Sequence, residues 1–196
     1  NKIIRFETFH TALQYFSYAL AGIPYMGTGR NLAYKKAVFI RNKGFSAHNH
    51  LPGGDDDLFI NAAATSRNTE VVIDKDAFTL SEPKASWREW MKQKQRHFTT
   101  SKYYKPRHKF LLGLYAASHF LFFLLLIASV VFFSWEITIG VFILRSIIQG
   151  AIWYNAMKKL NEQDLGKWYW AFDIFMFLYY LIFASALWKK PKKDWK

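Results

Sequence analysis

The sequence predicts an α/β domain followed by an all-α membrane region, and three observations lead to this prediction. In residues 1–109, helical patterns alternate with short β-branched stretches, and polar residues are mixed in throughout. Residues 110–196 are apolar, with charges only at isolated positions and at the end. Aromatic residues make up 19% of the chain, which is high for a soluble protein. We therefore expect two parts, 1–109 and 110–196, with two or three transmembrane helices in the second.

The formal net charge of the chain is +13, carried largely by Lys and Arg in 84–109 and in the tail 189–196. Because these cations flank apolar stretches, they suit an anionic lipid surface or a phosphate-rich substrate better than DNA, and we expect no nucleic-acid partner. The chain has no cysteine, which excludes disulfides and thiol chemistry. It opens within a helical pattern, with Asn1 in place of Met, so we expect a fragment of a longer protein.

The elements of the first part follow from local patterns. Apolar residues recur at spacings of three and four from Ile3 to Leu20, which predicts an amphipathic helix over 2–20. Two strands are expected from apolar and β-branched residues, at 31–34 and at 69–74 with a continuation over 77–80. Three further helices are expected over 37–43 with Gly44 as C-cap, over 55–66, and over 87–103 with Ser86 as N-cap.

An acidic run follows two glycines in the stretch LPGGDDDLFI, residues 51–60. The glycines allow a sharp turn, so Asp55, Asp56 and Asp57 fall in the first turn of the predicted helix, where the helix dipole favours negative charge. One interpretation is an acidic cap on an ordinary surface helix. The other is a set of carboxylates presented at a cleft.

His48 and His50 precede the acidic run as an H-x-H pair. On an extended segment both rings lie on one side of the chain, and this arrangement suits a metal ion when carboxylates are near. Two solvent-exposed loop histidines are the alternative interpretation.

The predicted helix 87–103 carries the basic sequence QKQRH at 93–97, close to the first apolar stretch. On its own, a basic helix beside a membrane span is typical of a lipid-headgroup anchor.

Taken in order, these segments resemble the C-terminal half of the catalytic domain of a membrane-bound family 2 glycosyltransferase, a family of the GT-A type. The sequence GTGRNLAY at 27–34, followed by a helix and Gly44, resembles the family's acceptor-side strand and helix. The sequence GDD at 54–56 resembles its T/G-E-D motif. The sequence QKQRH at 93–97 resembles its QxxRW motif, after which membrane helices follow.

The resemblance implies roles for the acidic and basic motifs. Asp56 matches the aspartate that takes the proton from the acceptor hydroxyl, Asp55 stands where the family has glutamate, and the adjacent Asp57 competes for the same role. Arg96 matches the arginine that neutralises the leaving diphosphate, and Gln93 matches the glutamine that hydrogen-bonds the sugar or the diphosphate.

Three further residues belong to the acceptor side of the implied site. His97 stands where the motif has Trp, and this smaller ring would stack less well on a sugar, which disfavours strict processive polymer synthesis. Gly29 and Asn31 lie in the acceptor-side segment.

The resemblance implies an inverting, hexosyltransferase-like enzyme. It would move a sugar from a nucleotide-sugar donor to a lipid-linked or glycan acceptor, as in the synthesis of cell-envelope polysaccharide. A divalent cation, Mg²⁺ or Mn²⁺, is implied as cofactor, bound mainly by an N-terminal donor-binding half that this sequence lacks, so the fragment alone is expected to be inactive. The alternatives are a non-catalytic membrane anchor or assembly module, and a metal-dependent hydrolase that uses His48, His50, Asp55, Asp56 and Asp57.

Residues 110–135 carry no formal charge and exceed the roughly 20 residues needed to cross a bilayer. The cations just before them predict an integral protein of the cell membrane, with membrane lipids as partners and the catalytic part on the cytoplasmic side. Further candidate spans follow at 137–157 and 168–188. Whether 137–157 crosses fully, and on which side the basic tail lies, is left open.

Arg145 and Asp173 interrupt the second and third candidate spans. A charge inside a membrane is a functional candidate, and the two residues have opposite signs. In an antiparallel crossing, however, they would lie about seven residues apart in depth, roughly 10 Å at the helical rise. This geometry disfavours a direct pair.

Overall fold

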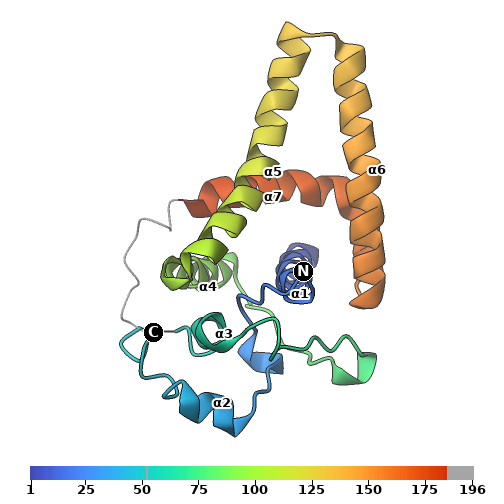
Figure 1. The fold of residues 1–196 in the computed structure, drawn as a ribbon. Coiled ribbons are helices and arrows are strands. Elements are labelled where there is room, and N and C mark those ends of the chain that lie inside the picture. The colour runs from blue at the N-terminus through green and yellow to red at the C-terminus, as the bar shows by residue number, and fades with distance from the viewer. Residues whose placement is uncertain (52, 185–196) are drawn as a thin grey trace. The chain divides into compact units, whose positions relative to one another are not determined.

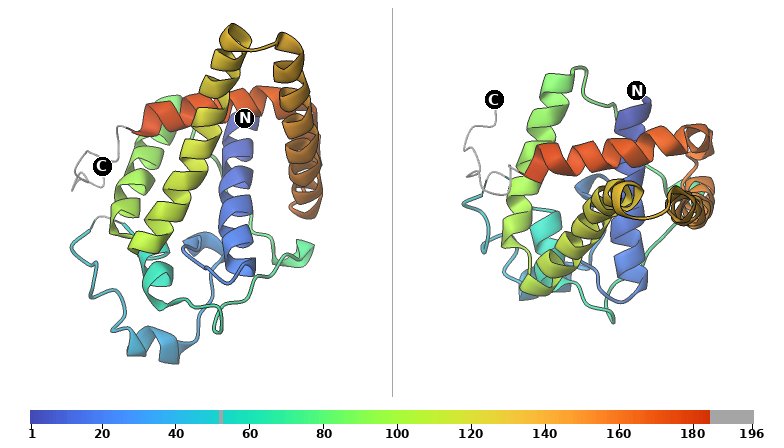
Figure 2. Two further views of the ribbon diagram at one scale, coloured as in Figure 1. Left: turned by 45° about the horizontal axis from the view of Figure 1, so that its top comes forward. Right: turned by 90° about the horizontal axis from the view of Figure 1, so that it is seen from above.

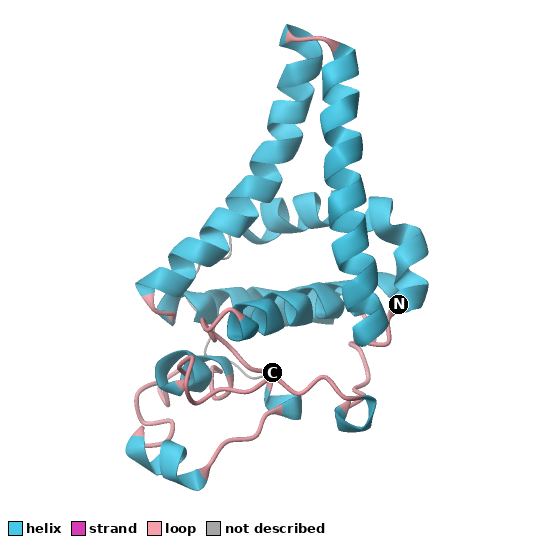
Figure 3. Ribbon diagram, turned by 45° about the vertical axis from the view of Figure 1, so that its right-hand side comes forward, coloured by secondary structure: helices cyan, strands magenta, loops and turns pink. Residues whose placement is uncertain are grey.

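A computed structural model describes residues 1–51 and 53–184, and over these residues it contains helices and loops but no strand (Figure 3). The described α-helices, labelled in Figure 1, are α1 (Lys2–Leu20), α2 (Lys36–Arg41), α3 (Asp57–Ala63), α4 (Trp87–Thr100), α5 (Pro106–Phe132), α6 (Trp135–Lys159) and α7 (Tyr169–Ala184). Short 3₁₀ helices lie at η1 (Gly29–Asn31), η2 (Lys75–Ala77), η3 (Ser101–Tyr103) and η4 (Gln163–Trp168).

The predicted α/β fold, and with it the GT-A-like domain, is wrong, because the described part of the chain is all-helical. The stretch 31–34 is mostly exposed chain that leaves η1, and 69–74 is a largely exposed loop. Leu32 does adopt extended angles, with φ −134° and ψ 128°. A strand, however, forms only by hydrogen bonding to a neighbouring strand, and β-propensity acts on the local backbone alone. Neither stretch has such a neighbour within 1–51 and 53–184.

The predicted helices of the first part are confirmed, although those at 37–43 and 55–66 are shorter than expected. α2 ends at Arg41 with Asn42 as its C-cap, so the predicted C-cap at Gly44 is wrong by two residues. Lys43 and Gly44 follow the cap with positive φ, 57° and 60°. Ser86 caps α4 as predicted, since its Oγ accepts a hydrogen bond from the Glu89 N–H at 3.3 Å.

The chain divides into two compact units. The hairpin unit comprises Asn1–Phe9 and Leu111–Ile182, and the loop-rich unit comprises His10–Phe110 together with the described residues after Ile182.

In the hairpin unit, α5 and α6 run antiparallel and α7 crosses them (Figures 1 and 2). By length and composition, α5 and α6 are both able to cross a membrane, which supports the spans predicted at 110–135 and 137–157. Part of the third candidate span, 168–188, and the basic tail lie outside the described residues.

The interior of the hairpin unit is aromatic. Phe6 of α1 stacks on Phe172 of α7 with ring centroids 4.2 Å apart, and lies 5.1 Å from the ring of Trp153 in α6. Just before η4 and within it, Glu162 and Asp164 are held by the guanidinium of Arg5. These contacts fix the end of α6, η4 and the start of α7 around the first turns of α1.

The expectation that Arg145 and Asp173 do not pair is wrong. The Arg145 guanidinium donates to both Asp173 carboxylate oxygens, at 2.5 and 3.1 Å, and Gln149 Nε2 donates to the same carboxylate at 2.6 Å. Asp173 is buried, and His119 of α5 lies beside the pair, with Nε2 3.3 Å from the Asp173 carbonyl oxygen. The depth argument fails because α7 crosses the hairpin instead of running antiparallel to α6 (Figure 1).

We expect Arg145→Leu to destabilise the protein by about 3 kcal/mol, because it leaves the buried Asp173 carboxylate without its cation. The double variant Arg145→Leu/Asp173→Leu should regain most of this loss, since no uncompensated charge remains. Thermal unfolding of the full-length protein in detergent would measure both. A double variant no more stable than the single one would contradict this account of the pair.

In the loop-rich unit, α3 is the central element. Phe59 is fully buried and packs against the rings of Tyr34, Phe39 and Phe45, with centroids 4.7, 5.8 and 6.0 Å away. Asn61, on the same short helix, is buried, and both its amide nitrogen and its amide oxygen make hydrogen bonds.

The Asn61 amide joins three separate segments of the chain. Its Nδ2 donates to the Tyr25 carbonyl at 2.8 Å and lies 2.8 Å from Nδ1 of His108, while its Oδ1 accepts from the Lys105 N–H at 2.9 Å. These bonds hold α3 in place, and with it the acidic run just before it.

Candidate functional site

A cavity of about 220 Å³ in the loop-rich unit brings the acidic and basic motifs together. One wall is the acidic run and its two glycines, and the other is the C-terminal part of α4. The lining residues are Gly53, Gly54, Asp55, Asp56, Asp57, Arg96, His97 and Thr100. Five predicted site residues, far apart in the sequence, therefore border one cavity.

The turn that forms the acidic wall depends on Gly54. Its φ of +98° lies in a region that residues with a side chain rarely adopt, and a Cβ there would lie 2.4 Å from Leu58 Cδ1. The glycine thus lets α3 begin immediately after the turn, and the three aspartates point in different directions from it.

Asp57 points into the protein and anchors the acidic run. Its Oδ2 accepts hydrogen bonds from the hydroxyls of Thr100 and Tyr104 at 2.8 and 2.7 Å, and its Oδ1 accepts from the Leu58 N–H at 2.8 Å. Burial raises the pKa of this carboxyl above its ordinary value, and the two hydroxyls oppose the rise. Asp57 therefore joins the turn to the end of α4 and to the segment after η3.

Asp56 points along the turn and caps α3. Its Oδ1 accepts from the Asp57 N–H at 2.8 Å, and its Oδ2 accepts from the Gly29 N–H at 2.8 Å. A Cβ on Gly29 would lie 3.2 Å from that Oδ2, so the glycine permits the close approach. The interpretation of the acidic run as a helix cap is thus confirmed for Asp56, and Gly29 of the acceptor-side segment lies beside it.

Asp55 points outward. It is exposed and lines the cavity, and among the three aspartates its carboxylate alone makes no hydrogen bond with the described residues.

The opposite wall and its surroundings are cationic. The pKa of His97 is lowered to about 4, first by loss of solvent around the ring and then by the charges of Lys94 and Arg96; Arg30 acts in the same direction and Asp56 opposes them. Because His97 also keeps exposed surface, water moderates this effect, but the direction leaves the ring neutral at pH 7. The cavity is thus lined by carboxylates on one wall and by an arginine on the other.

Three further predicted residues lie outside the cavity lining. Gln93 is half-buried one turn before Arg96 on α4. The Asn31 amide donates to the Ala77 carbonyl at 2.9 Å and so ties η1 to η2. Gly29 contacts the site through its N–H, which donates to Asp56.

His48 and His50 are not gathered with the acids. His48 is half-buried and His50 is exposed. Among the described residues, no three His, Cys, Asp or Glu side chains are placed to hold a metal ion. The residues present therefore do not form a divalent-cation site by themselves, and Mg²⁺ or Mn²⁺ stays a prediction from the resemblance.

Sequence reasoning missed the partners that hold this site in place. Thr100 and Tyr104 fix Asp57, and no local pattern marks either of them. Arg30 was passed over although it follows Gly29 directly, and that adjacency is the one signal that would have identified it. A larger cavity, of about 350 Å³, lies in the hairpin unit and contains none of the predicted site residues.

No protein-family model, curated protein or solved structure matches the chain. Over its described residues, the chain is an all-helical protein with two helices able to span a membrane. It has a cavity that is lined by carboxylates on one side and by cationic residues of α4 on the other.

The raised pKa of Asp57 predicts a pH dependence of stability. Between the unfolded value of about 3.9 and the higher folded value, the native state binds more protons than the unfolded state, so this group's contribution to stability falls as pH rises. Asp57→Asn removes the titrating group, so the stability of the variant relative to wild type should increase with pH across that window. Thermal midpoints measured from pH 4 to pH 8 would test this.

The matched variant Tyr104→Phe should act in the opposite sense. It removes a hydrogen bond to the carboxylate, should cost about 1.5–3 kcal/mol, and should steepen the pH dependence. Parallel pH profiles for wild type and both variants would contradict the role assigned to Asp57.

Proposed function

We propose that this protein is a membrane-bound glycosyltransferase that transfers a sugar from a nucleotide-sugar to a hydroxyl acceptor with inversion. The observation that supports the proposal is the convergence of Asp55, Asp56, Arg96 and His97 on one cavity. The proposal rests on the order of the motifs and on this cavity, and it does not depend on an α/β fold.

Such a site has two tasks in sugar transfer. A carboxylate takes the proton from the acceptor hydroxyl while that oxygen forms a bond to the anomeric carbon. The bond from the anomeric carbon to the phosphate oxygen breaks, and its electron pair leaves with the nucleoside diphosphate. The negative charge that develops on the diphosphate is then stabilised by cations already in position.

Among the three acids, the hydrogen bonds favour Asp55 as the base over Asp56, the residue that the resemblance indicates. Asp55 is exposed at the cavity, whereas both oxygens of Asp56 accept backbone N–H groups and Asp57 is buried. We propose that Asp56 and Asp57 hold the turn in shape so that Asp55 faces the acceptor.

For the leaving group, we propose Arg96 as the principal cation, with Arg30 as a second one. A guanidinium binds two phosphate oxygens at once, and two arginines match the charge of a diphosphate. Arg30 is exposed and follows Gly29, whose N–H is bonded to Asp56, so the backbone holds it next to the acidic wall. Its charge also reaches His97.

The membrane helices support a lipid-linked or membrane-proximal glycan acceptor. Lys102, Lys105, Arg107 and Lys109 cluster where α5 begins, which by the positive-inside rule favours a cytoplasmic face, where nucleotide-sugars are made.

The roles of the three aspartates can be distinguished by replacing each in turn with asparagine in the full-length protein. Asp55→Asn should lower the transfer rate at least about 100-fold without changing the thermal midpoint, because it removes a base that makes no structural bond. Asp57→Asn should change stability more than the rate, and Asp56→Asn should change both. Loss of transfer in Asp56→Asn with full activity in Asp55→Asn would return the base role to Asp56.

For the leaving group, we expect Arg96→Lys to lower the transfer rate, because an ammonium cannot reproduce the two-pronged contact. The loss should fall on kcat more than on KM, since charge builds on the diphosphate in the transition state. Arg30→Lys should lower the rate less, and Arg41→Lys, an exposed arginine of α2, should have no effect. His97→Trp should be tolerated and alter acceptor preference.

Steady-state transfer with radiolabelled nucleotide-sugar would measure these effects. Unchanged transfer in Arg96→Lys would identify this helix as a lipid-headgroup anchor, because attraction to headgroups follows net charge and not the shape of the cation. Retained transfer after removal of all three acids would contradict the transferase assignment.

A further inference from the structure

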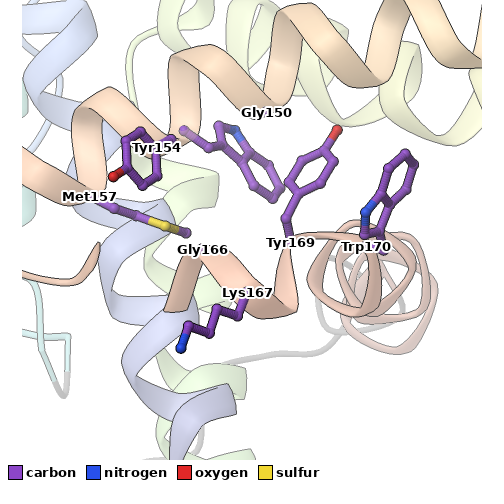
Figure 4. Close-up of a pocket in the computed structure, with 8 residues that line it drawn as sticks. Gly150, Tyr154, Met157, Gly166, Lys167, Tyr169 and Trp170 are labelled. Carbon is purple, nitrogen blue, oxygen red and sulfur yellow. The ribbon is translucent and has the colours of Figure 1, made fainter. Parts of the chain in front are cut away.

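The larger cavity of the hairpin unit lies between the C-terminal turns of α6, η4 and the start of α7 (Figure 4). It measures about 350 Å³, and its lining includes no residue of the proposed transferase site. Its lining residues are Gly150, Trp153, Tyr154, Met157, Gly166, Lys167, Tyr169 and Trp170. We propose that this cavity binds an anionic phospholipid of the surrounding bilayer.

Two glycines make room for the cavity. The ring of Tyr169 lies against α6 at Gly150, where a Cβ would be 3.7 Å from the ring, and Gly166 faces the ring of Tyr154, where a Cβ would be 3.3 Å away. Trp153 and Met157 close the inner side and are buried. The walls are therefore aromatic and apolar.

The outer side of the cavity is open and also aromatic. Tyr154 and Trp170 are 55% and 54% exposed, so about half of each residue's surface faces the surroundings of the protein. In an aqueous medium such exposure is unfavourable, whereas tryptophan and tyrosine are enriched at the boundary between lipid chains and headgroups.

The position of the cavity on α6 agrees with that boundary. It adjoins the last three turns of a helix that is able to cross a membrane, and that helix ends at Lys158 and Lys159. A lipid chain would lie along the aromatic wall, and its headgroup would lie towards Lys167, the cation that lines the cavity.

The charged side chains beside the cavity favour binding of a phosphate group. Lys167 lines the cavity, and Figure 4 shows its amine extending away from the aromatic rings. The nearby acids Glu162 and Asp164 are both held by Arg5. An aromatic wall with an ammonium beyond it matches a molecule that is apolar at one end and anionic at the other.

This inference does not depend on the transferase proposal and is tested by binding alone. The full-length protein, delipidated in neutral detergent, would be titrated with phosphatidylglycerol or with phosphatidylcholine and followed by native mass spectrometry. In detergent there is no charged bilayer surface, so attraction to scattered lysines contributes little. We expect one phosphatidylglycerol to bind saturably per chain, more tightly than phosphatidylcholine.

Variants distinguish lipid binding in this cavity from nonspecific attraction of anionic lipid to surface lysines. Lys167→Gln should weaken phosphatidylglycerol binding about fivefold and leave phosphatidylcholine unchanged, since it removes one cation near the phosphate. Tyr154→Ala should weaken the binding of both lipids by removing part of the wall. Lys159→Gln, at the end of α6 but outside the lining, is the matched control and should have little effect.

Three results would overturn the inference: equal affinity of the wild type for both lipids, equal losses in Lys167→Gln and Lys159→Gln, or unchanged binding in Tyr154→Ala. Because both cationic positions are exposed, these variants should fold, and unchanged thermal midpoints would verify it.

Discussion

The buried carboxylate of Asp57 determines how the loop-rich unit is put together. A carboxylate removed from water without partners costs several kcal/mol, and this one is compensated by the hydroxyls of Thr100 and Tyr104 and by the Leu58 N–H. Satisfying it brings the glycine turn against the end of α4. The cavity between the acidic and basic motifs is a consequence of that contact, because Arg96 and His97 lie on the same last turns of α4.

The hairpin unit also contains a buried carboxylate, and there a cation compensates its charge. Asp173 is also buried, but a cation from α6, Arg145, meets it there, and Gln149 adds a third hydrogen bond. Both carboxylates are buried, but the Asp57 carboxylate is compensated by hydroxyls and a backbone N–H, whereas the Asp173 carboxylate, beside helices able to span a membrane, is compensated by a counter-charge. This pairing fixes where α7 crosses the hairpin, and it thereby positions the start of α7 beside the cavity of about 350 Å³.

What the sequence predicts well is local. The helices follow from apolar spacing and from caps such as Ser86, and the two helices able to span a membrane follow from long, largely apolar stretches. The strands at 31–34 and 69–74 were predicted wrongly because pairing requires a distant partner that local propensity does not reveal. The convergence of Asp56 with Arg96 was anticipated from the order of motifs, not from geometry. Tyr104, which holds the site together, has no local signature at all.

The acidic run also shows why a motif cannot be interpreted as one functional unit. Only Asp57 belongs to α3, whereas Asp56 is its N-cap and Asp55 lies in the turn before it, so the backbone presents the three carboxylates to three environments. Asp57 turns inward to bind hydroxyls, Asp56 turns along the chain to bind backbone, and Asp55 faces the cavity. A reacting group must be held in place by others that do not react. The adjacency of three identical residues meets that requirement, because two of them can fix the turn while the third remains accessible to a substrate.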